Sequence, residues 1–427
     1  MNQANIISVI AMQTTTDQSY PAVQVTVTTA NGSTGTGSVY EAFSTSRYKP
    51  SFLYDQKQQY NGFGVTTAAA IINKIISPAL IGIPADQQGI VDDVIQSVMK
   101  EAGLPPYTNI SSPVSIAALK AGAAANGVPL YRHIGGQGAF TIPVGGYIAA
   151  SGGKRYNAKS ISQGRPEYNL VSYGFSTFAD AHYALWEAAN AYEKLLAKKY
   201  GIRIHRNFTM AIPAGKLDND MKLWDILTEG IAISGHAGKI GIHADVGANE
   251  YFDSSTGLYD GLFSAEKKDR SAMLDLYKKM TTDFPFVMIQ DPLEQDDLEG
   301  HAALVESTGV QIIGYDLFGT DVGRIKKCIN AGCVNSVLLP VCSYNTFSDV
   351  IDVVRYAKNH GIDVMPKNLA GEDMDVASYA VGFRAGAVYQ GGLDPACNYL
   401  LAFEQEIGPR AKFYGSYGLK GSKFCLV

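Results

Sequence analysis

From about residue 140 to the end of the chain, short apolar runs alternate with long segments of helical periodicity. The helical segments include residues 177–200, 218–234 and 265–282. The apolar runs read IGIHADV, FVMIQDP, VQIIGYDL, VNSVLLPV, GIDVMPK and GAVYQGG. Strands that are apolar on both faces are typical of a parallel sheet covered by helices. Six such strand–helix repeats favour closure of the sheet into a barrel.

The first 65 residues follow a different pattern. The runs IISVIAMQ and YPAVQVTVTTANGS alternate with the period of two that is typical of β-strands. The second run reaches Asn31-Gly32, a dipeptide favoured in the tight turns of β-hairpins. From Gly64 onward the periodicity is helical. The sequence therefore predicts an α+β domain at residues 1–138 and a β/α barrel at residues 139–427.

Composition excludes several classes of protein. The chain has 427 residues, 46% of them hydrophobic and 18% charged, so it can bury a large core. Its net charge of −5 argues against nucleic acid or an anionic membrane as a partner, because both require a concentrated basic surface. The five cysteines lack CxxC spacing, as expected for free thiols in a reducing compartment. No apolar run is long enough to span a bilayer, and we expect a cytoplasmic protein.

The carboxyl ends of the predicted barrel strands define the candidate site, because the functional residues of such barrels gather at that edge. In the run FVMIQDPLEQDD, the neutral Gln290 stands where acid–base chemistry or a divalent cation requires a charged oxygen. The strand-end set is poor in carboxylates. Its members are Asp245, Gln290, Tyr315, Asp316, Pro340, Pro366, Lys367 and Tyr389.

Blocks along nearly the whole chain resemble enolase. YPAVQVTV is similar to the family's NPTVEVEV, SIAALKAGAAANGVPLYRHIGG ends like its PLYRYL, and GIHADVGANEYFDSSTGLYD follows its D.AASEFY..G.Y. IQDPLEQDDLEGHAAL resembles IEDP..EDDW..W..L, GYDLFGTD resembles GDDL.VTN, and VNSVLLPVCSYNT resembles ANSILIK.NQIGT. The blocks keep the order and spacing of the family, so the resemblance implies its fold.

What the resemblance implies is an α/β protein with an N-terminal α+β cap and an enolase-type C-terminal β/α barrel, usually a homodimer. It also implies dehydration of 2-phosphoglycerate to phosphoenolpyruvate with Mg²⁺. In that reaction a base removes a weakly acidic proton beside a carboxylate, while metal ions hold the dianionic intermediate. Mg²⁺ takes oxygen ligands, and the family supplies three carboxylates from consecutive strand ends.

Most of the family's functional positions carry other residues in this chain. Of the three metal ligands only Asp245 is kept, and Gln290 and Tyr315 stand at the other two positions. Glu167 keeps the family's glutamate. The remaining degenerate positions are Pro340 for the catalytic lysine, Met210 for its acid partner, Lys367 and Asn368 for a His-Arg pair, Tyr389 for a substrate-binding lysine, Arg155 for a histidine and residues 40–46 for a flexible loop.

These replacements support three hypotheses. The leading one is a catalytically inactive enolase homologue that needs no cofactor and has a structural or protein-interaction role, for example in a cytoskeletal or axonemal assembly. Loss of the base, the acid and two ligands argues against an enzyme. The alternative is a barrel enzyme with altered chemistry on a small phosphorylated or carboxylate ligand, acting through Glu167, Lys154, Lys367 and Asp245. The third is residual enolase activity.

Two further carboxylates, Asp291 and Asp316, would form a weak cation site if they joined Asp245. Neighbours in a strand alternate between faces, so we expect both to point away from the ligand positions and to form structural hydrogen bonds or ion pairs. The Glu167–Lys367 pair is interpreted either as a retained salt bridge or as an acid–base pair for another reaction.

Residues 40–63 are rich in aromatic side chains, which either pack onto the cap and the vacated pocket or form a docking surface. Lys154-Arg155 follows two glycines, which is a weak phosphate-binding pattern, and we expect an exposed loop charge instead. The seven histidines are scattered without metal-ligand spacing.

Overall fold

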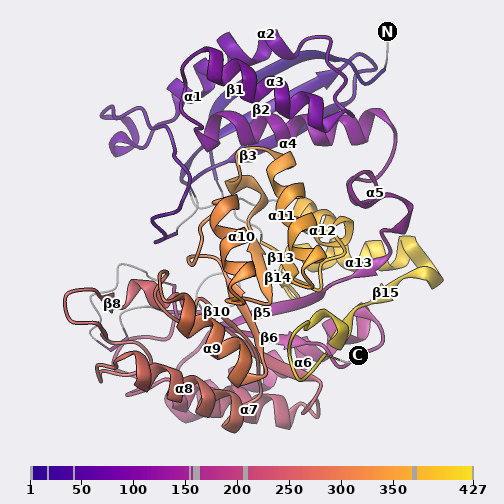
Figure 1. The fold of residues 1–427 in the computed structure, drawn as a ribbon. Coiled ribbons are helices and arrows are strands. Elements are labelled where there is room, and N and C mark those ends of the chain that lie inside the picture. The colour runs from indigo at the N-terminus through magenta and orange to yellow at the C-terminus, as the bar shows by residue number, and fades with distance from the viewer. Residues whose placement is uncertain are drawn as a thin grey trace.

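The computed structural model of the chain describes residues 3–16, 19–41, 44–152, 155–156, 164–204, 210–367 and 373–425. A cap of strands and helices, indigo and violet in Figure 1, lies against one end of a larger barrel. The predicted α/β class, with an α+β cap and a β/α barrel, is confirmed. None of the helices in this described part of the chain is long and apolar enough to cross a lipid bilayer.

The cap is built on a three-stranded antiparallel sheet in the order β1-β2-β3. The predicted turn at Asn31-Gly32 connects β2 to β3, and Gly32 has a φ of 84°, which glycine adopts without strain. The elements of the cap are β1 (Ile6–Thr15), β2 (Pro21–Thr29), β3 (Thr34–Val39), α1 (Thr66–Ile71), the π-helical turn η2 (Ile72–Ile76), α2 (Ser77–Leu80), α3 (Gln88–Glu101) and α4 (Thr108–Ala125).

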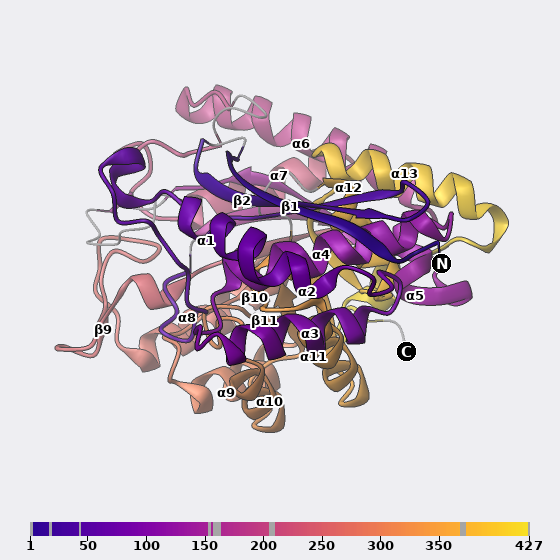
Figure 2. The same ribbon diagram turned by 90° about the horizontal axis from the view of Figure 1, so that it is seen from above.

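Helix α4 joins the cap sheet to the barrel. It packs closely on β3 because Gly35 and Gly37 have no side chain: a Cβ atom at Gly35 would lie 2.2 Å from the carbonyl oxygen of Ala117. On its other side, the Ser112 hydroxyl donates a hydrogen bond of 3.0 Å to the carbonyl of Cys342 in the barrel. Figure 2 shows α4 running beneath the cap sheet, between the sheet and the barrel.

A buried carboxylate at the cap–barrel interface fixes the two parts against each other. Asp92 of α3 accepts hydrogen bonds from the Ser115 hydroxyl (2.6 Å) and from the backbone N–H (2.9 Å) and hydroxyl (2.6 Å) of Ser348. Ser348 lies in the first turn of α11, where free backbone N–H groups favour a negative charge. Burial raises the pKa of Asp92 and the hydrogen bonds to its carboxylate oppose that rise.

The barrel is an eight-stranded sheet in the order β13-β12-β11-β10-β7-β6-β5-β14. A parallel bridge between Lys367 and Tyr389 joins its two outer strands and closes it. The strands are β5 (Val144–Ala150), β6 (Glu167–Ser172), β7 (Ile240–Asp245), β10 (Phe286–Gln290), β11 (Gln311–Gly314), β12 (Ser336–Leu339), β13 (Asp363–Pro366) and β14 (Ala387–Gly391).

The six predicted runs form strands that pair in parallel, as expected. The barrel also contains β5 and β6, which the sequence analysis did not predict, and β6 runs antiparallel to both β5 and β7. The described residues between β5 and β6 form no crossover helix, which a parallel connection would need. The Gly-containing run of β5 and the polar start of β6 lack the apolar pattern of the six repeats. The reversal matters for the site: it places Glu167, the first residue of β6, at the edge where the parallel strands end.

Helices surround the barrel, and short elements link the two parts. The predicted boundary after residue 138 falls between α5 and β4. The helices are α5 (Leu130–Gly135), α6 (Phe178–Tyr200), α7 (Met221–Ile233), α8 (Arg270–Asp283), α9 (Leu298–Thr308), α10 (Val322–Asn330), α11 (Phe347–Asn359), α12 (Asp373–Gly382) and α13 (Pro395–Ile407). Two small sheets pair β4 (Thr141–Ile142) with β15 (Lys412–Phe413), and β8 (Phe252–Asp253) with β9 (Leu258–Tyr259).

The Asp55 carboxylate caps α1 from a preceding loop, and we predict that replacing it destabilises the cap. It accepts hydrogen bonds from the backbone N–H groups of Thr66 (2.9 Å) and Thr67 (2.7 Å). Partial burial would raise its pKa, but these bonds outweigh burial and lower the pKa to about 2. Asp55→Ala should lower the free energy of unfolding by about 1 kcal/mol at pH 7, measured by urea denaturation.

The pH dependence follows from the lowered pKa. The unfolded carboxyl titrates near its ordinary value of about 4, so the stabilisation is complete above that pH and is lost as the pH falls through about 2. The difference between Asp55→Ala and wild type should therefore shrink in acid. The exposed Asp93 of α3 serves as the control, and an equal loss in Asp93→Ala would contradict the capping role.

Candidate active site at the barrel mouth

The structure brings four of the predicted positions into direct contact at the carboxyl edge of the barrel. The Tyr389 hydroxyl donates to the Glu167 carboxylate and, at 2.9 Å, to Oδ2 of Asp245. The Lys367 Nζ lies 4.2 Å from the centre of the Tyr389 ring. Tyr389 and Asp245 are buried, whereas Glu167 and Lys367 are partly exposed. The carboxyl of Glu167 and the amine of Lys367 are therefore the less buried groups of this cluster.

Burial shifts the pKa values of the two partly exposed groups toward each other. Burial and the neighbouring Asp245 raise the pKa of Glu167, against the opposing effect of Lys367. Burial also lowers the pKa of Lys367, although Asp245 and Glu167 oppose this. Loss of water disfavours the charged form of each group. The pair can therefore exchange protons with a ligand more readily than an exposed glutamate and lysine can.

His243 lies on β7 beneath this cluster. Its ring makes an edge contact with Tyr389 at 5.6 Å between centroids, and its Nε2 has no hydrogen-bond partner among the described residues. Burial lowers the pKa of His243 to about 4, so the ring is neutral at physiological pH. Its role here is to pack against Tyr389 and hold the phenol.

Arg165, which the sequence analysis overlooked, is the centre of a second charged cluster in the mouth, formed with Asp245, Glu250 and Asp316. Its guanidinium forms ion pairs with Asp245 (Nε to Oδ1, 3.1 Å), with Glu250 (3.7 Å) and with Asp316. Burial opposes its charge, but the surrounding carboxylates raise the pKa of Arg165 well above its ordinary value. Arg165 lies two residues before the start of β6, in a loop without a recognisable motif, and only the reversal of β6 brings it to this edge.

The expectation that Asp291 and Asp316 both point away from Asp245 is wrong for Asp316, because Asp316 and Asp245 pair with the same guanidinium of Arg165. Their predicted structural hydrogen bonds are present: Asp291 accepts from the backbone N–H groups of Tyr315 (2.8 Å) and Leu317 (3.2 Å). Asp291 has a φ of 47°, a left-handed backbone that breaks the strand alternation. Burial and the nearby Asp316 raise the pKa of Asp291 to about 7.

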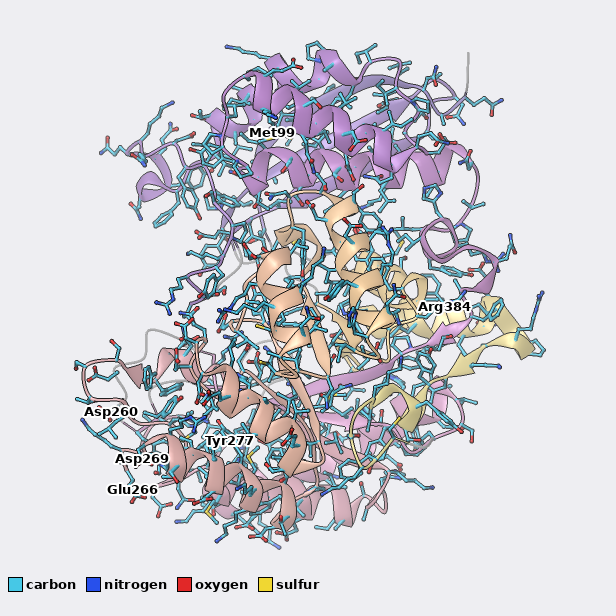
Figure 3. All side chains as sticks on the ribbon, viewed as in Figure 1. Met99, Asp260, Glu266, Asp269, Tyr277 and Arg384 are labelled. Atoms are coloured by element: carbon cyan, nitrogen blue, oxygen red, sulfur yellow. The ribbon has the colours of Figure 1, made fainter. Side chains whose placement is uncertain are left out.

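Gln290 lies one residue before this break and is completely buried. Its Nε2 is 3.5 Å from Oδ2 of Asp291, and its Oε1 has no hydrogen-bond partner in the described chain. The loop after Gln290 is held by α8, because the hydroxyl of Tyr277, labelled in Figure 3, donates to the carbonyl of Pro292 at 2.6 Å. The neutral amide avoids adding another charge beside Asp291.

The segment that replaces the family's flexible loop is bonded to the mouth. The hydroxyl of Ser44 (2.7 Å) and that of Thr45 (3.2 Å) donate to Asp316. Ser46 donates to Gln295, and Asn249 donates to Thr45. The segment covers the Arg165 side of the mouth.

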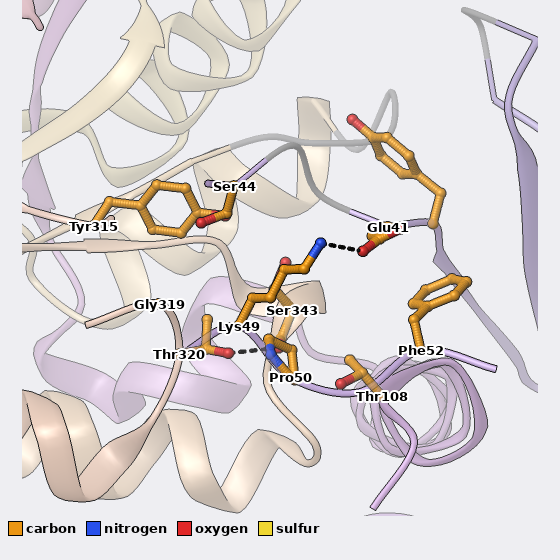
Figure 4. Close-up of a pocket in the computed structure, with 11 residues that line it drawn as sticks. Glu41, Ser44, Lys49, Pro50, Phe52, Thr108, Tyr315, Gly319, Thr320 and Ser343 are labelled. Atoms are coloured by element: carbon orange, nitrogen blue, oxygen red, sulfur yellow. Dashed lines mark hydrogen bonds and ion pairs between the residues drawn. The ribbon is translucent and has the colours of Figure 1, made fainter. Parts of the chain in front are cut away.

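The aromatic residues at 40–63 are expected either to pack onto the cap and the pocket or to form a docking surface. Most of those that the structure describes pack onto the protein. Tyr40 is buried, Phe52 packs on two hydrophobic clusters, and the Tyr48 hydroxyl bonds Asp296 at 2.9 Å. Tyr60 and Phe63 remain exposed. Beside the mouth, this segment and Tyr315 line a cavity with about 360 Å³ of empty space, in which Lys49 pairs with Glu41 at 2.8 Å (Figure 4).

Two predicted positions contribute no polar side chain to the mouth, and two others lie outside the described residues. Pro340 follows β12 and is buried, with its carbonyl accepting from the backbone N–H of Ser343. Met210 lies apart from the cluster, in a groove that Tyr147, Trp186 and Gln390 also line. Asn368 and Lys154 fall outside the described residues.

The residues at the three ligand positions do not fit Mg²⁺. They offer the Asp245 carboxylate, the Gln290 amide and the Tyr315 phenol, and burial raises the pKa of that phenol so that it stays protonated. Mg²⁺ requires octahedral oxygen ligands. Within the described residues, no group of three or more His, Cys, Asp or Glu side chains is arranged to hold a metal ion. The Arg165 guanidinium lies against the kept ligand instead.

The fold and the mouth define an α/β-barrel protein with an N-terminal cap and a charged cluster at the carboxyl edge. Two family models match it: "Enolase, N-terminal domain" at residues 6–134 and "Enolase, C-terminal TIM barrel domain" at residues 140–421. The chain belongs to the enolase family.

Relatives named Enolase match nearly the whole chain. One from Methanococcus maripaludis is 31% identical over 94% of this chain and 96% of its own. One from Methanopyrus kandleri is 30% identical over 96% and 97%, and one from Bifidobacterium longum is 31% identical over 99% and 100%. Our expectation that the chain is not an enzyme is contradicted, because these end-to-end relatives carry the name of an enzyme.

Gln290→Glu should destabilise the protein, because it adds a buried charge beside Asp291 and Asp245. We expect a loss of about 2–4 kcal/mol at pH 7 in urea denaturation. The buried glutamate would have a raised pKa, so the penalty is present above the unfolded pKa of about 4.3 and disappears as the pH falls below it.

Gln311→Glu is the matched control. Gln311 is also buried, but it is the first residue of β11 and so lies away from the carboxyl edge of the barrel. Gln311→Glu therefore adds the cost of burying a carboxylate, but it does not add a charge to the carboxylate cluster of the mouth. A Gln290→Glu protein as stable as wild type at pH 7 in metal-free buffer would refute this account of the site.

Proposed function

We propose that the chain is an enolase-family enzyme that transfers a proton to and from a carbon atom beside a carboxylate group in a small molecule. The observation that carries this proposal is the contact of Glu167, Tyr389 and Lys367 at the barrel mouth, with a raised pKa for Glu167 and a lowered pKa for Lys367. Acid–base catalysis favours groups whose pKa lies near the working pH.

The geometry suggests a role for each residue. Lys367, in its neutral form, accepts the proton from the substrate carbon and becomes an ammonium ion. Protonated Glu167 then donates a proton to the same carbon from the opposite side and becomes a carboxylate, so that the substrate regains the proton it lost. Tyr389 is a positioning residue, because its hydroxyl bonds both Glu167 and Asp245 and its ring contacts the Lys367 amine.

The charge balance favours a singly charged carboxylate over a phosphorylated dianion. Arg165 and Lys367 face the carboxylates of Asp245, Glu250 and Asp316 in the mouth. The Arg165 charge is engaged by those carboxylates, and Lys367 acts as a neutral base, so the described cluster offers little positive charge to compensate a phosphorylated dianion.

Enolase activity on 2-phosphoglycerate is the second candidate, and the names of the relatives favour it. It needs a different base, because Pro340 stands at the position of the family's catalytic lysine. Lys367 is the nearest described amine to Glu167 and Asp245 for that role. The cytoskeletal setting stays an untested prediction.

Proton transfer is measured by the exchange of substrate C–H for deuterium in heavy water, followed by NMR. The panel contains 2-phosphoglycerate, glycerate, lactate, malate and related acids, each with and without Mg²⁺. We expect exchange with at least one acid and a loss of about 10²–10⁴-fold in Lys367→Met and Glu167→Gln. The rate should rise with pH through a value below 10.5, because Lys367 must be neutral.

Matched controls lie elsewhere in the fold. Lys423→Met removes an exposed lysine that donates to the carbonyl of Thr281, and Glu193→Gln alters another Tyr–Glu pair, with Tyr147. Both should exchange at the wild-type rate. Absence of exchange with every acid, or equal rates in Lys367→Met and wild type, would reject the proposed reaction.

The homodimer implied by the resemblance also remains a proposal, supported by apolar side chains exposed on two elements. Ile10 is 60% exposed on the edge strand β1, and Tyr183 and Trp186 stack at 6.2 Å on the surface of α6. Sedimentation should show a dimer, and Trp186→Glu should shift it toward monomer. A wild-type monomer at micromolar concentration would contradict the proposal.

A further inference from the structure

We propose that Arg165 is a built-in replacement for the divalent cation of the barrel mouth. Its guanidinium supplies the positive charge around which the carboxylates gather. The mouth then binds a metal ion only when this side chain is removed.

The first support is the geometry of the ion pairs. Three carboxylates reach Arg165: Asp245 at the end of β7, Glu250 in the turn η4 (Ala248–Glu250) and Asp316 after β11. The side chains of all three are at most 5% exposed, and that of Arg165 is 9% exposed. Asp245 and Glu250 belong to one strand-to-loop connection and Asp316 to another, and the guanidinium compensates the charge of all three. With the arginine in place, these described carboxylates do not form a group that could hold a metal ion.

The second support is the space made for this side chain. Gly247 follows the end of β7 with a φ of 55°, and a Cβ atom there would lie 2.3 Å from Cδ of Arg165. The family motif D.AASEFY has alanine at this position, so the glycine matches the presence of the arginine. The Tyr251 hydroxyl donates to the backbone carbonyl of Arg165 at 2.6 Å and holds the residue in place.

The third support is that a divalent ion and the Arg165 guanidinium cannot both bind Asp245. A divalent ion bound to Asp245 Oδ1 would lie within a few ångströms of the guanidinium nitrogen that is already 3.1 Å from the same oxygen. Two cations at that separation repel strongly in a buried site. Conversely, removal of the guanidinium leaves three buried carboxylates with uncompensated charge, which favours either unfolding or capture of a cation.

The test compares thermal unfolding of wild type and Arg165→Ala in EDTA and in excess Mg²⁺ or Mn²⁺. Wild type should melt at the same temperature in both conditions. Arg165→Ala should be destabilised in EDTA and recover by about 3 °C or more when the metal is at 100 times its dissociation constant. Arg155→Ala is the matched control, because Arg155 is a buried arginine that pairs with the single carboxylate of Asp220. It should be destabilised without any response to metal.

Two measurements remain decisive if Arg165→Ala does not fold in EDTA. Refolding from urea with and without Mg²⁺ should then show rescue by the metal, and an equal failure in both conditions would overturn the proposal. Mn²⁺ titration of the wild-type protein, followed by electron paramagnetic resonance, should show no tight site. A single tight site that Asp245→Asn abolishes would overturn it as well. Both readouts need no substrate, so they stand apart from the proposed reaction.

Discussion

Closure of the barrel is the constraint on which the rest of the molecule depends. The bridge between Lys367 and Tyr389 joins the outer strands and makes a circular edge from strand ends that lie far apart in sequence. The reversed β6 adds its first residue to that edge, so that Glu167 faces Asp245, 78 positions further along the chain. Without closure, Lys367 and Tyr389 would lie at opposite margins of an open sheet, and the acid–base cluster would not exist.

Closure of the barrel brings several carboxylates together at its carboxyl edge. The buried part of the mouth supplies the cation and the hydrogen-bond donors that compensate their negative charge. Carboxylates in a medium of low polarity are costly unless a cation or hydrogen-bond donors surround them. Arg165 supplies the cation, the Ser44–Thr45 segment supplies hydroxyl donors to Asp316, and backbone N–H groups hold Asp291. Gln290 fits the same scheme, since a neutral amide adds no further negative charge. The cap is thereby tied to the chemistry of the barrel, because residues 44–46 belong to the segment that leaves its sheet.

Membership of the enolase family and the replacement of the family's ligand and lysine positions are compatible once the mouth is considered as a whole. The lysine lost at Pro340 has a counterpart in Lys367 on the neighbouring strand, which meets the kept Glu167 through Tyr389. Two carboxylates that match the family's motifs, Glu250 and Asp316, pair with the Arg165 guanidinium. A cation therefore lies beside the kept Asp245 although two of the family's ligand positions are replaced.

The sequence by itself determined the class of fold, the order of its two parts and which strand ends face the mouth, because hydrophobic periodicity and motif spacing are local properties of the chain. It also identified Asp245 as the kept ligand position and Gln290 and Tyr315 as the two altered ones. Only the tertiary structure decided the direction of β6, the place of Arg165 and the pairing of Asp316 with the same guanidinium as Asp245. Those features depend on a strand reversal, a left-handed residue and a glycine that makes room for an arginine from a distant loop. No local pattern encodes such contacts, because their energy comes from charges that meet only after the barrel has closed.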